Sequence, residues 1–97
     1  KIMNKIASNE KIKSELEILN GWIYVDNKLR KEVLFESYMD SIDFITTLAK
    51  RAEEIAHHPD LAVGYCKIVV EFTSHDLGGV SEECLGMARF INSITSN

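Results

Sequence analysis

The stretch SIDFITTLAKRAEEIAHHP, residues 41–59, predicts an amphipathic helix that ends at a proline. Asp40 is a suitable N-cap for it, and Asp43 stands three residues later as a partner of the capping-box kind. Apolar residues then recur at helical spacing, at Ile42, Ile45, Leu48, Ala49, Ala52, Ile55 and Ala56. We therefore expect a helix over about residues 41–57 that covers one face of a sheet.

The segments on either side of this helix predict the strands of that sheet. Before it, residues 22–25 and 32–38 have extended patterns, joined by a hairpin turn at Asp26-Asn27. After it, residues 62–74 are expected to be extended, with the part around 63–65 as a separate short piece. Three residues of this run alternate with more polar ones and should face the core: Ile68, Val70 and Phe72.

Two further helices complete the pattern. Ser8 can cap a helix that runs to about Leu19, and residues 1–7 before it are expected to fray. Ser81 can cap the last helix, which has acidic residues in its first turn. The order helix, strand, strand, helix, strand, strand, helix predicts an α+β two-layer sandwich. We expect one domain over residues 1–97, with a four-stranded antiparallel sheet and the helices on one face.

Composition narrows the class of protein. The net charge of −4 and the lack of a basic stripe argue against direct nucleic-acid binding, and the cluster Lys28, Arg30 and Lys31 is expected in a solvated turn. There is neither an apolar run of about 20 residues, as a membrane helix needs, nor a signal-peptide pattern. Cys66 and Cys84 have no zinc-site spacing and suggest reduced thiols. We expect a cytoplasmic location, with the nucleus as a second one.

The histidines carry the chemistry of this chain. His57 and His58 end the predicted helix, directly before the only proline, and His75 follows the next extended run, from which it could return to the same place. Glu53 lies four residues before His57 and shares its helix face. An imidazole exchanges protons near neutral pH, and the negative end of a helix favours its cationic form. These residues are candidates for an acid–base site.

The sequence supports three other kinds of site less well. Three imidazoles and a water can hold zinc, which keeps a zinc-dependent hydrolase open as an alternative, although adjacent histidines rarely converge on one ion. No activated nucleophile is recognisable, since the chain has no G-x-S-x-G elbow. The pair Gly78-Gly79 lacks the glycine spacing and the lysine of a phosphate-binding loop.

The spacing of these residues resembles that of the pterin-4a-carbinolamine dehydratases, whose vertebrate members are also called dimerisation cofactor of a homeodomain transcription factor. The matching pattern is Glu53, three residues, His57-His58-Pro59, five residues, Tyr65, nine residues, His75. Shorter matches support it along the chain from about residue 8 to 94: Gly21-Trp22, Ser74-His75-Asp76, Gly78-Gly79, Ser81 and Met87-Ala88.

The resemblance implies a reaction and a set of roles. The family dehydrates 4a-hydroxytetrahydrobiopterin, the pterin-4a-carbinolamine, to quinonoid dihydropterin, which recycles the pterin cofactor of aromatic amino acid hydroxylases without a metal or an organic cofactor. His57 and His75 would be the acid–base pair on the two faces of the pterin, and His58 would position its ring. Substrate binding would also involve Glu53, which would orient His57, together with Pro59 and with Trp22 as a wall of the pocket.

One departure from the family pattern concerns the last helix. The family has an aspartate nine residues after the third histidine, and this chain has Cys84 there. If that carboxylate orients the site, its absence is expected to weaken activity, with Asp76 and Glu83 as candidates to replace it. The substitution keeps a non-catalytic dimerisation or regulatory module open as an alternative. The resemblance also implies a homodimer or homotetramer and, in family members, a transcription-factor partner.

Overall fold

A computed structural model describes residues 4–95 and contains, within that range, three helices and four strands. In chain order they are α1 (Asn9–Leu16), β1 (Ile23–Val25), β2 (Lys28–Leu34), α2 (Tyr38–Ile55), β3 (Asp60–Gly64), β4 (Lys67–Phe72) and α3 (Glu82–Ile94). This is the predicted order of elements. Within the described residues, no helix is both long enough and apolar enough to span a membrane.

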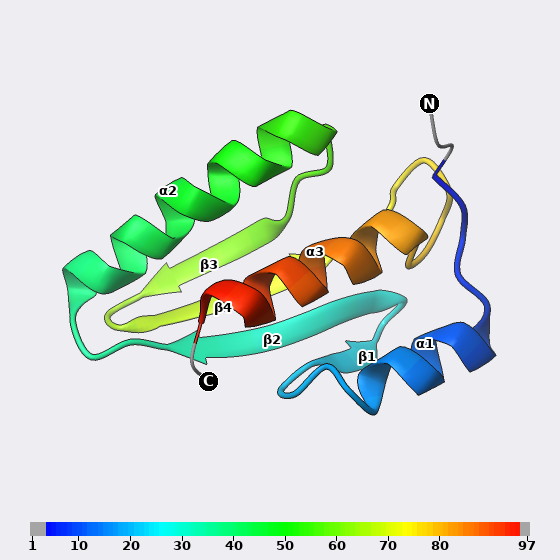
Figure 1. Ribbon diagram of the computed structural model, residues 1–97, viewed down its shortest axis with the longest axis horizontal. Helices are drawn as coiled ribbons and strands as arrows, with labels where there is room; N and C mark the ends of the chain where they lie inside the picture. The colour runs from blue at the N-terminus through cyan, green and yellow to red at the C-terminus, as the bar shows by residue number, and fades with distance from the viewer. Residues whose placement is uncertain (1–3, 96–97) are drawn as a thin grey trace.

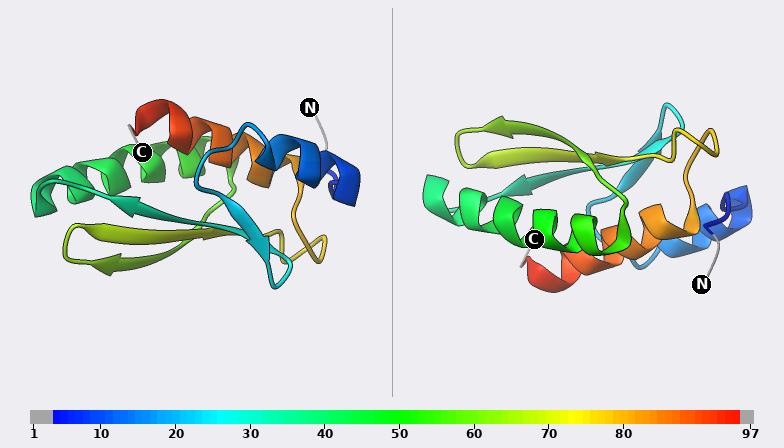
Figure 2. Two further views of the ribbon diagram at one scale, coloured as in Figure 1. Left: turned by 90° about the horizontal axis from the view of Figure 1, so that it is seen from below. Right: turned by 90° about the horizontal axis from the view of Figure 1, so that it is seen from above.

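The four strands form one antiparallel sheet in the order β1-β2-β4-β3 (Figure 1). The central pair, β2 and β4, aligns Leu29 with Phe72 and Val33 with Ile68, and β1 and β3 are the edge strands. Both views of Figure 2 place the helices on one face of this sheet. The predicted α+β two-layer sandwich is thereby confirmed.

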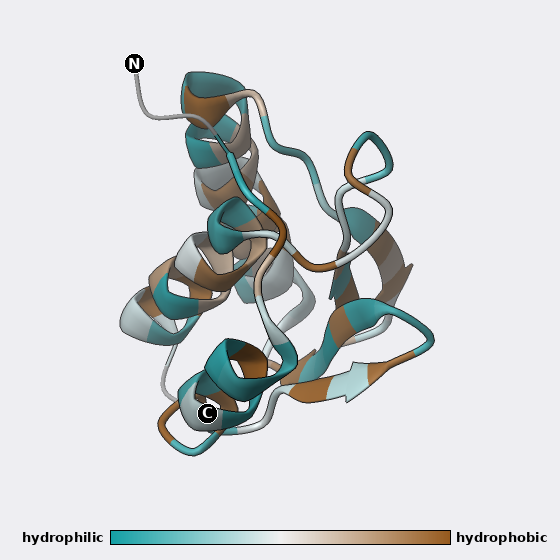
Figure 3. Ribbon diagram, turned by 90° about the vertical axis from the view of Figure 1, so that its right-hand side faces the viewer, coloured by the Kyte–Doolittle hydropathy of each residue, from teal (hydrophilic) through white to brown (hydrophobic). Residues whose placement is uncertain are grey.

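The core lies between the two layers, which are seen end-on in Figure 3. Alternating residues of the central strands point toward the helices, and apolar positions of α2 and α3 cover them. The fully buried members include Leu29, Val33, Leu48, Ile68, Val70, Phe72, Leu85, Ala88 and Ile91. The prediction that Ile68, Val70 and Phe72 face the core is confirmed.

Helix α2 begins earlier than predicted, and its buried face includes residues that the predicted apolar stripe left out. Ser37 is the N-cap, since its hydroxyl accepts a hydrogen bond from the Asp40 amide at 3.1 Å, so Asp40 stands inside the first turn rather than at the cap. Serine caps as well as aspartate does, and an acidic residue is favourable in a first turn. The buried face includes Ser41 and Phe44, which the predicted stripe omitted, whereas Ala49 is exposed.

The hairpin turn predicted at Asp26-Asn27 is confirmed, but the bounds of the strands differ from the prediction. Asp26 and Asn27 have positive φ angles of 50° and 64°, and this two-residue turn brings Val25 opposite Lys28. The return strand is therefore Lys28–Leu34 rather than residues 32–38. The run predicted as residues 62–74 is two strands, separated by a tight turn in which Cys66 has a φ of 56°.

The basic cluster is in β2 and not in a solvated turn. Lys31 is 2% exposed on the helix-facing side of the sheet, where its Nζ donates to Asn92 Oδ1 at 2.7 Å. Burial lowers the pKa of the Lys31 ammonium. Trp22 Nε1 donates to the same Asn92 oxygen at 2.9 Å, so one amide from α3 satisfies two buried donors.

The predicted caps of the outer helices are confirmed, but the N-terminal end is more ordered than expected. Ser8 caps α1 and Ser81 caps α3, each through its hydroxyl oxygen. Helix α1 ends at Leu16, before the expected Leu19. The Ala7 amide donates to the Val80 carbonyl at 2.9 Å, which ties part of the expected frayed end to the start of α3. Residues 1–3 and 96–97 lie outside the described part of the chain.

Candidate active site

The end of α2 presents the first two histidines. Ala56 adopts a left-handed conformation, with φ 54° and ψ 43°. The His57 amide donates to the Ala52 carbonyl at 3.0 Å, and the Ala56 amide donates to the Glu53 carbonyl at 3.4 Å. This pair of bonds is a Schellman motif, which closes a helix and turns the chain away from its axis. His57 therefore leaves the helix toward the sheet, next to the turn where the sequence predicted it.

The third histidine lies in a closed loop that follows β4. The Ser74 amide donates to the Gly79 carbonyl at 2.8 Å, and the Gly78 amide donates back to the Ser74 carbonyl at 2.8 Å. Gly78 has a φ of +78°, a conformation in which glycine is strongly favoured. Ser74 is buried at the base of this loop, and His75 next to it is exposed.

These two segments enclose a pocket of about 230 Å³. Its lining comes from the end of α2 and from the loop after β4: Ala56, His57, His58, Thr73, Ser74, His75 and Asp76. The three histidines, up to 18 positions apart in the sequence, thus share one pocket.

His57 is the buried member of the three, with 8% of its surface exposed. Its ring is stacked on Phe72, with the ring centroids 5.9 Å apart and the planes 9° apart. Its Nε2 lies 3.1 Å from Cys84 Sγ, and its Nδ1 lies 3.7 Å from Glu83 Oε1. Both ring nitrogens therefore face side chains of the first turn of α3.

Burial affects the protonation of both His57 and Cys84. Desolvation lowers the pKa of His57, the Glu83 carboxylate opposes that effect, and the neighbouring His58 adds to it. Burial likewise raises the pKa of the Cys84 thiol, against hydrogen bonds with Ser81. With the thiol protonated and the carboxylate beside Nδ1, the favoured arrangement is Nδ1–H toward Glu83 and Nε2 accepting from the thiol.

His58 and His75 have a different setting, open to solvent. His58 Nε2 lies 2.5 Å from Glu53 Oε2, and the two side chains are 57% and 78% exposed. The sequence-based expectation that Glu53 orients His57 is wrong, because the left-handed turn at Ala56 carries His57 inward and leaves His58 beside Glu53. Asp76 lines the pocket beside His75.

Two predicted pocket residues are elsewhere. Within residues 4–95, the pocket lining includes neither Pro59 nor Trp22. Trp22 is 5% exposed in the core, 6.2 Å from the Phe72 ring on which His57 also stacks, so it reaches the pocket only through Phe72. Sequence reasoning missed Phe72 as the support of His57. The alternation of β4 placed it in the core but could not indicate its neighbour.

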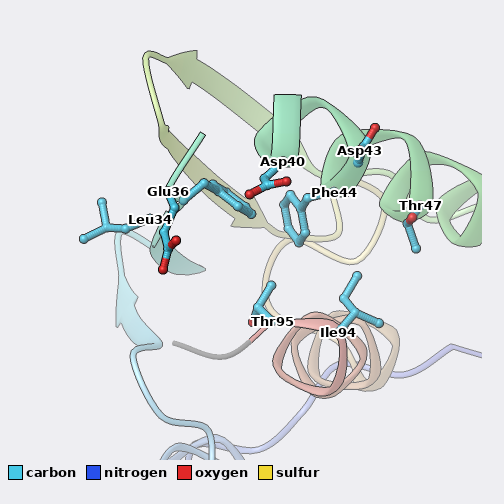
Figure 4. Close-up of a pocket in the computed structure, with 9 residues that line it drawn as sticks. Leu34, Glu36, Asp40, Asp43, Phe44, Thr47, Ile94 and Thr95 are labelled. Atoms are coloured by element: carbon cyan, nitrogen blue, oxygen red, sulfur yellow. The ribbon is translucent and has the colours of Figure 1, made fainter. Parts of the chain in front are cut away.

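A larger hollow lies away from the histidines, between the start of α2 and the end of α3 (Figure 4). It measures about 620 Å³ and is lined by Leu34, Phe35, Glu36, Asp40, Asp43, Phe44, Thr47, Ile94 and Thr95. Its ionisable groups are three carboxylates, and no histidine is among the residues that line it. The smaller histidine pocket is therefore the better candidate for proton transfer.

The side chains of residues 4–95 offer no arrangement for a metal ion. Within the described part of the chain, no group of three or more His, Cys, Asp or Glu side chains is placed to hold one. The two nitrogens of His57 face a thiol and a carboxylate, and the Nε2 atom of His58 faces Glu53. The pocket thus combines two imidazoles that follow α2 with one from the loop after β4.

The chain is thus a small α+β sandwich with three histidines in one pocket, and comparison with known proteins gives its family. The model of the pterin 4 alpha carbinolamine dehydratase family matches residues 5–94. The chain belongs to this family.

Similar proteins agree with this assignment. A Sulfolobus acidocaldarius protein whose name includes pterin-4-alpha-carbinolamine dehydratase is 40% identical over 90 residues, which are 93% of this chain and 98% of that protein. A Saccharolobus solfataricus protein with the same words in its name is 42% identical over 82 residues, which are 82% of this chain and 81% of that protein. The crystal structure of a transcriptional coactivator/pterin dehydratase from Brucella melitensis superposes with a TM-score of 0.90 at 26% identity, covering 95% of this chain and all of that one.

Proposed function

We propose that this chain dehydrates a 4a-hydroxytetrahydropterin to the quinonoid dihydropterin by histidine acid–base catalysis. The observation that carries the proposal is the single pocket that holds His57, His58 and His75. Membership of the family and the names of its relatives support the reaction type. The substrate is expected to be 4a-hydroxytetrahydrobiopterin, and the product would return to the cofactor cycle of an aromatic amino acid hydroxylase.

The surroundings of the three imidazoles favour a division of roles other than the one expected from sequence. His58 and His75 are exposed and able to meet a substrate, and we assign them the acid and base roles. Glu53 would orient His58 through its hydrogen bond. His57 is enclosed by Phe72, Glu83 and Cys84, and both its ring nitrogens face α3, so we assign it to forming the floor of the pocket.

The proposed step transfers one proton to the substrate and removes another proton from it. An imidazolium protonates the hydroxyl on C4a, the C4a–O bond breaks, and water leaves. The lone pair of the adjacent ring nitrogen forms the new C=N bond, and a neutral imidazole takes the proton that this nitrogen then loses. Atoms and charge balance without an oxidant, a metal or an organic cofactor.

The assembly and location of the chain remain part of the proposal. Two sheet edges, β1 and β3, and exposed apolar residues such as Val63 and Tyr65 favour a homodimer or homotetramer. The free thiols Cys66 and Cys84 favour a reducing compartment, the cytoplasm or the nucleus. The neighbour's name, transcriptional coactivator/pterin dehydratase, suggests a protein partner in addition to the pterin.

Alanine variants of the two exposed histidines test the assignment. His58→Ala and His75→Ala should each lower kcat by about 100-fold or more, because each removes one proton-transfer group. Glu54→Ala is the matched control, since Glu54 is an exposed carboxylate at the same helix end that pairs only with Arg51 at 3.4 Å. The measurement is the loss of 4a-hydroxytetrahydropterin followed by ultraviolet absorbance.

Each variant must also keep the thermal unfolding transition of the parent. A folded His75→Ala protein with parental turnover would contradict the acid–base assignment. A parent chain no faster than the uncatalysed reaction would instead favour the dimerisation or regulatory module.

A further inference from the structure

The turn between β1 and β2 contacts the loop that carries His75, although some 50 residues separate them in the sequence. Both views of Figure 2 place this turn beside the loop that follows β4. The contact is made by Asn27, which neither lines the histidine pocket nor matches any part of the family pattern quoted above. Because the loop holds one of the proposed proton-transfer groups, the contact bears on catalysis.

Asn27 holds the loop on both sides of His75. On the side before it, the Thr73 hydroxyl donates to the Asn27 carbonyl at 3.0 Å. On the side after it, Asn27 Nδ2 donates to the Gly78 carbonyl at 2.5 Å. Asn27 is thus hydrogen-bonded to the loop two residues before and three residues after His75.

The Asn27 side chain is itself held in place. Tyr24 donates its hydroxyl to Asn27 Oδ1 at 3.1 Å, which fixes the amide so that its nitrogen faces the loop. A Cβ atom on Gly79 would lie 3.1 Å from the same oxygen, so the loop backbone packs closely against the amide. The backbone φ of +64° is one that asparagine tolerates better than most residues, so residue type and turn geometry agree.

We propose that Asn27 is a positioning residue, which sets the place of the His75 imidazole by clamping both ends of its loop. The proposal rests on the proposed function for its catalytic consequence, and the clamp itself can be measured separately. Within residues 4–95, the other hydrogen bonds of this loop are internal and join Ser74 to Leu77, Gly78 and Gly79. Without the clamp, those internal bonds would keep its shape but not its position against α2.

The test compares Asn27→Gly with Asp26→Gly. Asn27→Gly keeps the left-handed backbone and removes the side-chain bonds to Gly78 and Tyr24. Asp26→Gly relieves the same backbone conformation, φ 50°, in the same turn, and Asp26 makes no side-chain hydrogen bond or ion pair within residues 4–95, so it is the matched control.

Two readouts are taken on each protein: hydrogen exchange of the Leu77, Gly78 and Gly79 amides, and steady-state kinetics of pterin dehydration. Asn27→Gly should speed exchange of these amides about tenfold, as expected for the loss of a net hydrogen bond. It should also lower kcat by about tenfold, because a small displacement of a catalytic group is costly, with a smaller change in KM. Asp26→Gly should match the parent in both.

Unchanged hydrogen exchange of the loop amides in Asn27→Gly would contradict the clamp without bearing on the proposed dehydratase function. Faster exchange with parental kcat would overturn the positioning role. An inactive parent chain would contradict the proposed function, and the exchange comparison would then still decide whether Asn27 holds the loop.

Discussion

At the scale of single residues, the side chain at position 84 influences the pKa of the buried His57 imidazole. The resemblance to the family raises the question of what a thiol does where a carboxylate is usual. In the structure, this thiol lies 3.1 Å from His57 Nε2 and is fully buried, so the position is in direct contact with the site. A protonated thiol adds no charge, which leaves desolvation as the main influence on the pKa of His57.

Replacing that thiol by a carboxylate should therefore favour the protonated, cationic form of the His57 imidazole. In Cys84→Asp, an anion beside Nε2 favours the cationic form, so the pKa of His57 should rise above its value in the parent. The measurement is an NMR titration of the His57 ring protons, with Cys84→Ser as a control that keeps a neutral partner. An equal His57 pKa in the parent and in Cys84→Asp would contradict the contact.

At the scale of elements, the end of α2 brings the site together at a cost in backbone energy. Ala56 occupies the left-handed position of the Schellman motif, where glycine is usual, and it lines the pocket beside His57. The motif turns His57 inward, and His58 stays on the helix side facing Glu53.

Ala56→Gly should raise the free energy of unfolding by about 1 kcal/mol, because it removes the Cβ clash of a left-handed residue. Urea denaturation measures the change. Ala49→Gly is the matched control: Ala49 is exposed within α2, and this substitution should lower stability by about 1 kcal/mol. A destabilised Ala56→Gly would contradict the strain at the helix end.

Local signals explain which elements could be predicted. Ser8 and Ser81 cap their helices as expected, and the alternation in β4 correctly assigns its buried side, because both signals act over a few residues. The start of helix α2 was predicted three residues too late, because Ser37 and Asp40 are both suitable caps and local sequence does not choose between them. A tight turn at Cys66 has no glycine or asparagine to signal it.

The site could be predicted in part. The spacing of the family pattern groups His57, His58 and His75, and the structure places them in one pocket. The partners of each ring could not be predicted, because they depend on which way the chain turns after α2. That turn separates two adjacent histidines into a buried one that meets Cys84 and an exposed one that meets Glu53.

At the scale of the whole molecule, the buried imidazole links stability to pH. His57 is packed between the sheet residue Phe72 and the first turn of α3, so it contacts both layers of the sandwich. Its pKa in the folded protein lies below the ordinary value of 6.5. Between these two values the unfolded chain binds more protons than the folded one, so stability increases with pH there.

The free energy of unfolding should therefore be independent of His57 above about pH 6.5 and should fall as the pH drops through the lowered pKa. Urea denaturation between pH 7.5 and pH 5.5 measures it. The variant His57→Gln removes the titrating group and should have a flatter profile over that range. Equal slopes for the parent and His57→Gln would contradict a buried, neutral His57.

The most direct test of the central claim is the rate at which 4a-hydroxytetrahydropterin disappears, followed by ultraviolet absorbance with and without the chain in the presence of a strong chelator. The proposal predicts an acceleration that survives the chelator, since it assigns both proton transfers to His58 and His75 and none to a metal ion. A rate equal to that of the uncatalysed dehydration, or an acceleration that the chelator abolishes, would contradict metal-free histidine catalysis in this pocket.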